Sequence, residues 1–385
     1  MVYLDNSATT RPSAEVLAAI HRVLTEDFGN PSALYGLGLS AEKLLKEARE
    51  NVAASLGCGR DEVFFTSGGT ESDNWAIKGV WESRHRQGNR IISTSVEHPA
   101  VLRCLDSLKK QGADIVLIDP AADGTVSAAK IAAALTEETI LVSVMHVNNE
   151  TGAVMPIREI KDAMIKAGSK AYLHTDAVQS YGKLDCDVGK LGVDLLSLSG
   201  HKVHGPKGIG ALYVRRGLHL PVFIHGGGQE SGQRSGTENM PGIAGLGAAA
   251  LHVKKHRTDD YSSLCELKKR LWTRISSEIP DVRLNGPDLE LACPSVLNVS
   301  FIGCRAEVLL HMLDQAGICV STGSACSSHS HGSHVLTAMK LRPEELEGAI
   351  RFSFSSDNTP EEMDYAADQL IKTVTTHRKL MKYHH

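Results

Sequence analysis

The sequence predicts an α/β fold, in which a mostly parallel sheet of seven strands is wrapped by helices and followed by a smaller α+β domain. Seven short runs rich in apolar and β-branched residues occur at 62–66, 90–94, 114–118, 140–147, 171–175, 194–199 and 210–214. Several are apolar without alternation, as expected of strands that are covered on both faces. Amphipathic stretches at 72–87, 99–112 and 156–168 lie between the runs, which is typical of helices around a parallel sheet.

The pattern changes near residue 255. It predicts a long polar-faced helix at 261–279, a helix at 304–316, and short strands around 295–301 and 351–355. A chain of 385 residues is also too long for one typical core. We therefore predict a large domain at 12–255 and a small domain made of 1–11 and 256–385.

Composition excludes several classes of protein. The 42% hydrophobic and 22% charged content is that of an ordinary globular chain, and a net charge of -4 gives no reason to expect direct binding to nucleic acid. No apolar run is long enough to span a bilayer, and the first residues lack the regions of a signal peptide, so we predict a cytoplasmic protein without a membrane partner. The eight cysteines form no CxxC pair, which favours neither a disulfide framework nor a structural zinc site.

Polar or glycine-rich segments follow the predicted strands, where α/β folds bind ligands. After 62–66, Gly68 and Gly69 allow a tight turn and Thr70 opens a helix, which forms either an anion cradle or an ordinary capped turn. After 90–94, His98 precedes a proline, where a lone histidine commonly caps or packs. Asn148 ends the strand at 140–147.

Two further strand ends carry groups that are unusual in a buried setting. Asp176 and Gln179 follow 171–175, and Ser199, His201 and Lys202 follow 194–199. A buried aspartate requires a positive partner, whereas a lysine alone at a strand end would extend its ammonium into water. Taken together, an anion cradle, an acid, amides, an imidazole and a lysine are the groups that pyridoxal phosphate uses.

The motifs that carry these residues resemble those of a known family. The segments are "YLDNSATT", "TSGGTESDNWAIKG", "EHPAV", "NNETG", "HTDAVQ", "SGHKVHGPKGIGALYVRRG", "GGGQESGQRSGTEN" and "STGSACSS". They are similar, in order from residue 3 to about 360, to the cysteine desulfurases, class V aminotransferases of pyridoxal-phosphate fold type I. The spacing after "STGSAC" is similar to the longer-loop branch of that family.

The resemblance implies a role for each matching residue in holding the cofactor. Lys202 would bind it covalently, Asp176 would pair with its ring nitrogen, and His98 would stack on the ring and shuttle protons. Gln179 would bond the phenolic oxygen of the ring, and Asn148 would contact the cofactor and the substrate. Phosphate would be held by Gly69, Thr70, Ser199, His201 and, from a second subunit of a homodimer, Thr237.

The resemblance also implies the reaction, in which L-cysteine becomes L-alanine and its sulfur passes to an enzyme cysteine. Cys326 would take the sulfur as a persulfide, so the catalytic residues would be Lys202, Cys326 and His98. Asn6, Asn148 and Arg351 would frame the substrate, with the Arg351 guanidinium on its carboxylate. Arg351 could instead be a surface arginine at a strand edge, and Cys319 looks buried and inert.

The sequence does not identify the molecule that accepts the sulfur from Cys326. The short segment after the helix at 360–380 makes thiolation of tRNA or a cofactor at least as good an expectation as delivery to an iron–sulfur scaffold. The small polar residues around Cys326 predict that 327–333 are poorly ordered. His329, His331 and His334 are potential metal ligands, but no carboxylate accompanies them in the sequence, so we predict no metal. The alternatives are an aminotransferase, a kynureninase-like enzyme or a selenocysteine lyase on the same fold, and a catalytically inactive scaffold.

Overall fold

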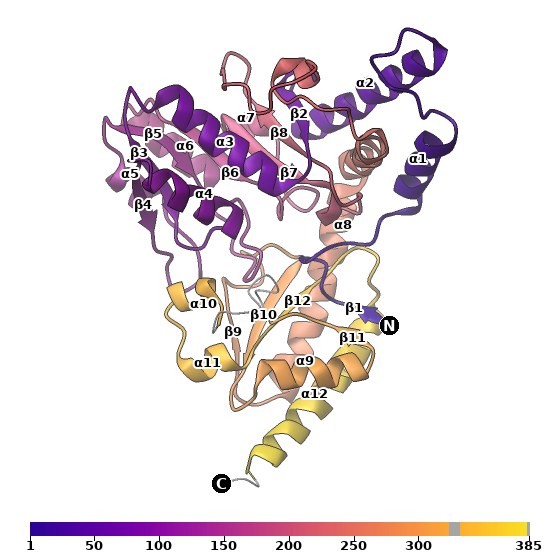
Figure 1. Ribbon diagram of the computed structural model, residues 1–385. Coiled ribbons are helices and arrows are strands. Elements are labelled where there is room, and N and C mark those ends of the chain that lie inside the picture. Colours follow the sequence, from indigo (N-terminus) through magenta and orange to yellow (C-terminus); the bar gives the residue numbers. More distant parts are fainter. Residues whose placement is uncertain (323–331, 383–385) are drawn as a thin grey trace.

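The computed structural model describes residues 1–322 and 332–382. Figure 1 shows two layers of structure stacked end to end, with the large sheet and its helices above and a smaller sheet with α9 and α12 below. The long helix α8 (Met240–Glu278) runs from the upper part into the lower part. The N-terminal strand β1 (Val2–Tyr3) lies in the lower part, beside β11 (Ile318–Cys319), with which it pairs in parallel.

The large sheet has seven strands in the order β2-β8-β7-β6-β5-β3-β4. All its pairings are parallel except those of β8, which runs against both of its neighbours. This confirms the predicted fold class and all seven runs, although the run at 140–147 leaves the strand after Ser143. The strands are β2 (Val63–Thr66), β3 (Arg90–Thr94), β4 (Asp114–Ile118), β5 (Thr139–Ser143), β6 (Tyr172–Asp176), β7 (Leu195–Ser199) and β8 (Gly210–Val214).

Both faces of this sheet are buried. Alternate residues of the strands, such as Leu195 and Leu196, belong to two separate apolar clusters. One cluster packs against α3 (Gly69–Arg84) and α4 (Pro99–Lys109), the other against α2 (Gly36–Leu56), α6 (Ile157–Lys166) and α8. The remaining helices of this part are α1 (Ala14–Thr25), α5 (Ala128–Ala134), α7 (Val188–Leu191) and the short 3-10 helices η1 (Arg60–Glu62), η2 (Gly200–Lys202) and η3 (Glu230–Gly232).

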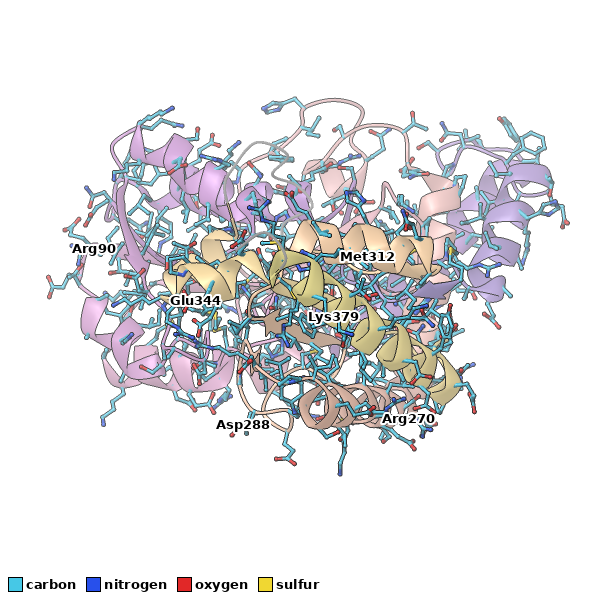
Figure 2. The ribbon with its side chains drawn as sticks, turned by 90° about the horizontal axis from the view of Figure 1, so that it is seen from below. Arg90, Arg270, Asp288, Met312, Glu344 and Lys379 are labelled. Atoms are coloured by element: carbon cyan, nitrogen blue, oxygen red, sulfur yellow. The ribbon has the colours of Figure 1, made fainter. Side chains whose placement is uncertain are left out.

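The lower part is built on a three-stranded antiparallel sheet in the order β12-β10-β9. Its core is a third apolar cluster, to which Leu4, Leu271, Phe301 and Phe352 belong. Seen from below in Figure 2, α12 with Lys379 lies between α9, which carries Met312, and α8, which carries Arg270. The elements are β9 (Val282–Leu284), β10 (Val296–Phe301), α9 (Ala306–Gln315), α10 (His334–Ala338), α11 (Pro343–Glu347), β12 (Ala349–Ser353) and α12 (Pro360–Lys382).

Two features differ from the predicted organisation. The helix expected at 261–279 begins at Met240, because the charged residues near 255, which looked like a boundary, are the exposed side of a continuous helix. A Cβ at Gly247 would lie 2.7 Å from the Cα of Ala48, so this glycine lets α8 approach α2 closely. In addition, Val335 and Met339 pack into the large apolar cluster of the upper part. The domain bounds stay a prediction.

The described helices include none that is both long enough and apolar enough to cross a membrane.

Candidate active site

The predicted cofactor residues come together at one edge of the large sheet. Strands β2, β3, β5, β6 and β7 run in the same direction, so their carboxyl ends meet at this edge. Asp176 is the last residue of β6 and Ser199 the last of β7, and both are buried. The first residues of the chain cross the same edge, which the sequence indicated only through "YLDNSATT".

Lys202 ends the short helix η2, directly after β7. Its Nζ donates hydrogen bonds to the main-chain oxygens of Ser7, at 2.5 Å, and Ala8, at 2.8 Å. The N-terminal segment also holds the residue before it, because the amide and hydroxyl of Thr10 both donate to the carbonyl of His201. The lysine is therefore half-buried at the sheet edge and does not extend into water.

Asp176 lies within electrostatic reach of His98 and Lys202, two of the residues that the sequence groups with it. Burial raises the pKa of its carboxyl, while His98 and Lys202 act in the opposite direction. Burial lowers the pKa of His98, which Asp176 partly offsets. The Nδ1 of His98 accepts the amide of Ala100 at 3.1 Å and caps α4, so Nε2 is the ring nitrogen left for a ligand.

The predicted anion cradle follows β2. Gly68 has a φ of 152°, and a Cβ at Gly69 would lie 2.6 Å from Cγ2 of Val178, so this turn requires glycine. In the described chain, the amides of Gly69, Thr70 and Glu71 at the start of α3 have no protein acceptor. Thr70 is exposed, and with His98 it lines a cavity of about 380 Å³ between α3 and α4.

His201 is a neutral imidazole beside this edge. Burial lowers its pKa to about 4, and the charge of Lys202 adds to that effect. Its Nδ1 lies 3.2 Å from the hydroxyl of Thr9. Gln179 is buried and donates to the main-chain oxygen of Ser7 at 3.1 Å.

Arg351 lies on β12 and is buried, so it is no surface arginine. One Nη donates to Asp5 Oδ1 at 2.8 Å, and the other to the main-chain oxygen of Asn149 at 3.0 Å. Asn6, the residue after Asp5, is also buried. Its side-chain amide donates to the carbonyls of Tyr3 and Ser353. Its Nδ2 protons are thus used by the protein, so Asn6 can offer a ligand its oxygen only.

Asn148 does not have the role that the sequence predicts. Its Nδ2 donates to the carbonyl of Val96 at 3.0 Å, and its Oδ1 accepts the amides of Glu150 and Thr151. The side chain is fully buried and shapes the turn after β5, which leaves no free oxygen and no well-placed donor for a cofactor or a substrate. Asn149, the next residue, is half-buried beside Arg351 and is the better candidate.

Of the remaining predicted residues, one is not joined to this edge and one lies outside the described part of the chain. Thr237 is exposed on the segment before α8, and no hydrogen bond of the described residues links it to the other cofactor candidates. Cys326, with His329 and His331, lies outside the described residues. Cys319 is half-buried rather than buried, and burial raises the pKa of its thiol, which agrees with an inert cysteine.

The described chain resumes at Gly332 and packs against the upper part of the molecule. Of the range 327–333, residues up to 331 lie outside the described part, whereas Ser333 is buried. Its hydroxyl donates to Glu150 and accepts the amide of Leu336, capping α10. His334 Nε2 lies 3.0 Å from the main-chain oxygen of Glu97, and the described residues include no cluster suited to a metal ion.

Sequence reasoning missed a group of buried acids behind Asp176. Asp73 on α3 is almost fully buried, and burial together with Asp176 raises the pKa of its carboxyl well above the ordinary value. His174 lies 3.6 Å away, between the hydroxyls of Ser143 and Ser197, and burial lowers its pKa to about 3. Because apolar strands surround these residues, no local pattern in the sequence marks them.

Glu97 is the third buried acid, and burial raises its pKa to about 8. Its Oε1 accepts the hydroxyl of Thr94 and the amide of Met145, at 2.8 and 2.9 Å. Between the ordinary pKa near 4.5 and about 8, the folded protein keeps a proton on Glu97 that the unfolded chain releases. Stability is therefore lost as the pH rises through this window.

We expect Glu97→Gln to reduce this loss of stability. The glutamine keeps the accepting oxygen and removes the titration, so the fall in unfolding temperature from pH 6 to 8.5 should be smaller than in the wild type. Thermal unfolding followed by circular dichroism measures it, with the exposed Glu82→Gln as control. If the unfolding temperature fell equally in Glu97→Gln and Glu82→Gln, the raised pKa of Glu97 would not be the cause of the pH dependence.

These residues fit pyridoxal phosphate. A phosphate matches the free amides at Gly69, a protonated ring nitrogen matches the buried carboxylate of Asp176, and an aldehyde matches the amine of Lys202. The fold and this set of side chains are therefore those of a pyridoxal-phosphate enzyme of fold type I.

Comparison with known proteins gives the family. Residues 2–366 match the aminotransferase class-V family. The chain is 45% identical over 381 residues to cysteine desulfurase IscS of Clostridium botulinum, covering 98% of this chain and 96% of that one. It is 42% identical to cysteine desulfurase IscS of Methanosarcina thermophila, covering 98% and 93%.

Solved structures agree. A NifS-like protein superposes with a TM-score of 0.92 at 36% identity, covering 97% of this chain and 99% of that chain. SspA in complex with cysteine superposes with a TM-score of 0.82 at 36% identity, covering 93% and 100%. The chain belongs to the aminotransferase class-V family and, within it, to the cysteine desulfurases, which depend on pyridoxal phosphate.

Proposed function

We propose that this cysteine desulfurase converts L-cysteine to L-alanine with Lys202, His98 and Cys326 as its catalytic residues, and that Cys326 carries the sulfur to a protein acceptor. The observation that carries the proposal is the meeting of Lys202, Asp176 and His98 at the edge of the sheet where the glycine turn also lies. A neighbouring structure, SspA, is described in complex with cysteine.

The cofactor, when bound, withdraws electrons from the substrate and so eases loss of its Cα proton. Asp176 would hold a proton on the ring nitrogen, and Lys202 would attach the cofactor. The Lys202 amine would take the Cα proton of the substrate. Gln179, Ser199, His201 and the turn at Gly69 and Thr70 would keep the cofactor in place.

The substrate would be held by its carboxylate on the Arg351 guanidinium, with Asn149 in the position that the sequence suggested for Asn148. The thiolate of Cys326 would then take the substrate sulfur as a persulfide while alanine leaves. We propose that the persulfide passes to a thiolation enzyme or to an iron–sulfur scaffold.

A homodimer is part of this proposal. Thr237 is exposed, and large apolar side chains between residues 17 and 39 are exposed as well, including Leu34 and Tyr35. Such a patch supports burial against a second copy, in which Thr237 would reach the partner's phosphate.

The direct test of the function supplies the holoenzyme with L-cysteine and counts alanine formed per active site, with and without a thiol reductant. Without reductant, one alanine and one persulfide per subunit are expected, and with reductant the reaction should turn over. Transfer of the amino group to an added 2-oxo acid, with no persulfide on the protein, would instead identify an aminotransferase.

Arg351→Ala should act on substrate binding. Loss of a buried partner for a carboxylate costs about 2 kcal/mol or more, so the KM for cysteine should rise at least about 30-fold. The visible absorbance of the bound cofactor should stay normal. Steady-state kinetics measures the change.

The control for this variant is Asp5→Asn, which removes the ion pair of Arg351 and keeps the guanidinium. If Arg351 binds the substrate, Asp5→Asn should leave the KM unchanged or lower it. An equal rise in both variants would mean that Arg351 acts through Asp5 on the structure alone.

A further inference from the structure

A second lysine, Lys183, contacts the main chain of Lys202. Its Nζ donates a hydrogen bond to the carbonyl oxygen of Lys202 at 2.7 Å. Lys183 lies outside the quoted motifs and has no part in the proposed reaction. An ammonium that ends on a main-chain carbonyl inside a partly buried site forms a charge-assisted hydrogen bond, which is roughly twice as strong as a neutral one.

The turn that carries Lys183 begins directly after Asp176. The amide of Ala177 donates to the carbonyl of Ser197 on β7, and the amides of Lys183 and Leu184 donate to the carbonyl of Ser180. Gly182 has a φ of +80°, and a Cβ there would lie 2.7 Å from Cγ1 of Val203. The turn is thus pressed against the residue that follows Lys202.

The same turn also reaches the side chain of Lys202. Gln179 Nε2 donates to the main-chain oxygen of Ser7 at 3.1 Å, and Lys202 Nζ donates to that oxygen at 2.5 Å. One end of the turn therefore shares an acceptor with the amine of Lys202, and the other end bonds its carbonyl. The turn thus bonds the main chain of Lys202 directly and is linked to its side chain through the Ser7 oxygen.

The main chain at Lys202 has little regular structure to hold it. Helix η2 has three residues, and its cap residue Val203 bonds back to Gly200. The next residue, His204, has a φ of 60°, a strained value for a side chain other than glycine. A 3-10 turn this short is weak by itself, so contacts from outside determine where the Cα of Lys202 lies.

We propose that Lys183 is a positioning residue, which fixes the main chain of Lys202 so that its amine meets the cofactor and then the substrate. This rests on the proposed role of Lys202. A displacement of about 1 Å in a reacting group can cost about a hundredfold in rate, so the loss of such a contact is measurable. Because Arg351 and Asn149 lie on other elements, substrate binding should be little affected.

The test compares Lys183→Met, which keeps the length and removes donor and charge, with Lys183→Arg, which keeps both. The control is Lys207→Met, which removes a charge from an exposed position five residues after Lys202. Each purified holoenzyme is reduced with borohydride, and the fraction of Lys202 peptide that carries the cofactor is measured by mass spectrometry across a titration with pyridoxal phosphate. Steady-state kcat and KM and the thermal unfolding temperature are measured on the same samples.

We expect Lys183→Met to need more pyridoxal phosphate for half-maximal labelling of Lys202 and to lower kcat about tenfold or more, with KM within about threefold. Lys183→Arg should restore both to within about threefold, and Lys207→Met should match the wild type. Unchanged labelling and kcat in a folded Lys183→Met would overturn the inference, as would equal losses in Lys207→Met. Failure to label Lys202 in the wild type would instead overturn the proposed role of Lys202.

If Lys183→Met proves poorly folded, Lys183→Gln provides the second variant, because it keeps a neutral donor. Partial labelling of Lys202 and a kcat below that of the wild type, by up to about tenfold, are expected from Lys183→Gln. A kcat for Lys183→Gln and Lys183→Arg that tracks only their unfolding temperatures would mean that Lys183 stabilises the fold without positioning Lys202.

Discussion

Lys202→Ala should yield a protein that does not hold its cofactor covalently and does not release alanine from L-cysteine. The physical reason is that the Lys202 amine lies where the Ser7 and Ala8 carbonyls come together, within electrostatic reach of Asp176. Wild-type protein reduced with borohydride should carry the cofactor on the peptide with Lys202, and the variant on none. Absorbance of the dialysed protein measures the cofactor that is retained, and peptide mass spectrometry identifies the lysine that carries it.

The matched control is Lys207→Ala in the same segment, which should keep both the covalent cofactor and the activity. A cofactor trapped on another lysine of Lys202→Ala, with activity kept, would overturn the assignment. Noncovalent binding by the variant is compatible with it, because the turn at Gly69 and the carboxylate of Asp176 remain.

Cys326→Ser should separate cofactor chemistry from sulfur transfer. The variant should bind pyridoxal phosphate and respond to L-cysteine with the spectral change of the wild type, but form no alanine and no persulfide. A hydroxyl cannot take over the reaction, since a thiolate is the nucleophile that attacks sulfur. Quantification of alanine and intact mass of the protein after one turnover measure the result.

Cys319→Ser is the control for this prediction. Its thiol is half-buried on β11, with a raised pKa, and should not be needed. Steady formation of alanine by Cys326→Ser would show that the nucleophile is elsewhere, and loss of activity in Cys319→Ser would identify it there.

The sheet and much of its edge were predictable from the sequence because the signals are local. A run of apolar residues marks each strand, and the residues directly after β6 and β7 are the ones that the strands bring together. The start of α8 was not predictable in the same way, because a helix that changes its buried side between two cores shows no single periodicity. The turn after β5 determines whether Asn148 or Asn149 faces the site. Because the two residues are adjacent and identical, the sequence does not indicate which one it is.

The buried acids Asp73 and Glu97 show a different limit. Both lie within the quoted motifs, Glu97 directly before His98 and Asp73 three residues after Thr70, but their pKa values depend on strands that are distant in sequence. The contact of Lys183 with Lys202 is of the same kind, since it joins two turns through a main-chain oxygen that has no signature in the sequence.

The uninterrupted path of α8 through both parts has a consequence for how the protein unfolds. Ile243 and Leu246 of this helix belong to the upper core, whereas Leu264 and Leu271 belong to the lower one. A cut at residue 255 would leave each half of the helix to form without the other, and helices gain stability from their length and packing. We therefore expect the two cores to unfold together, so that loss of the part that holds Arg351 also loosens the part that holds Lys202.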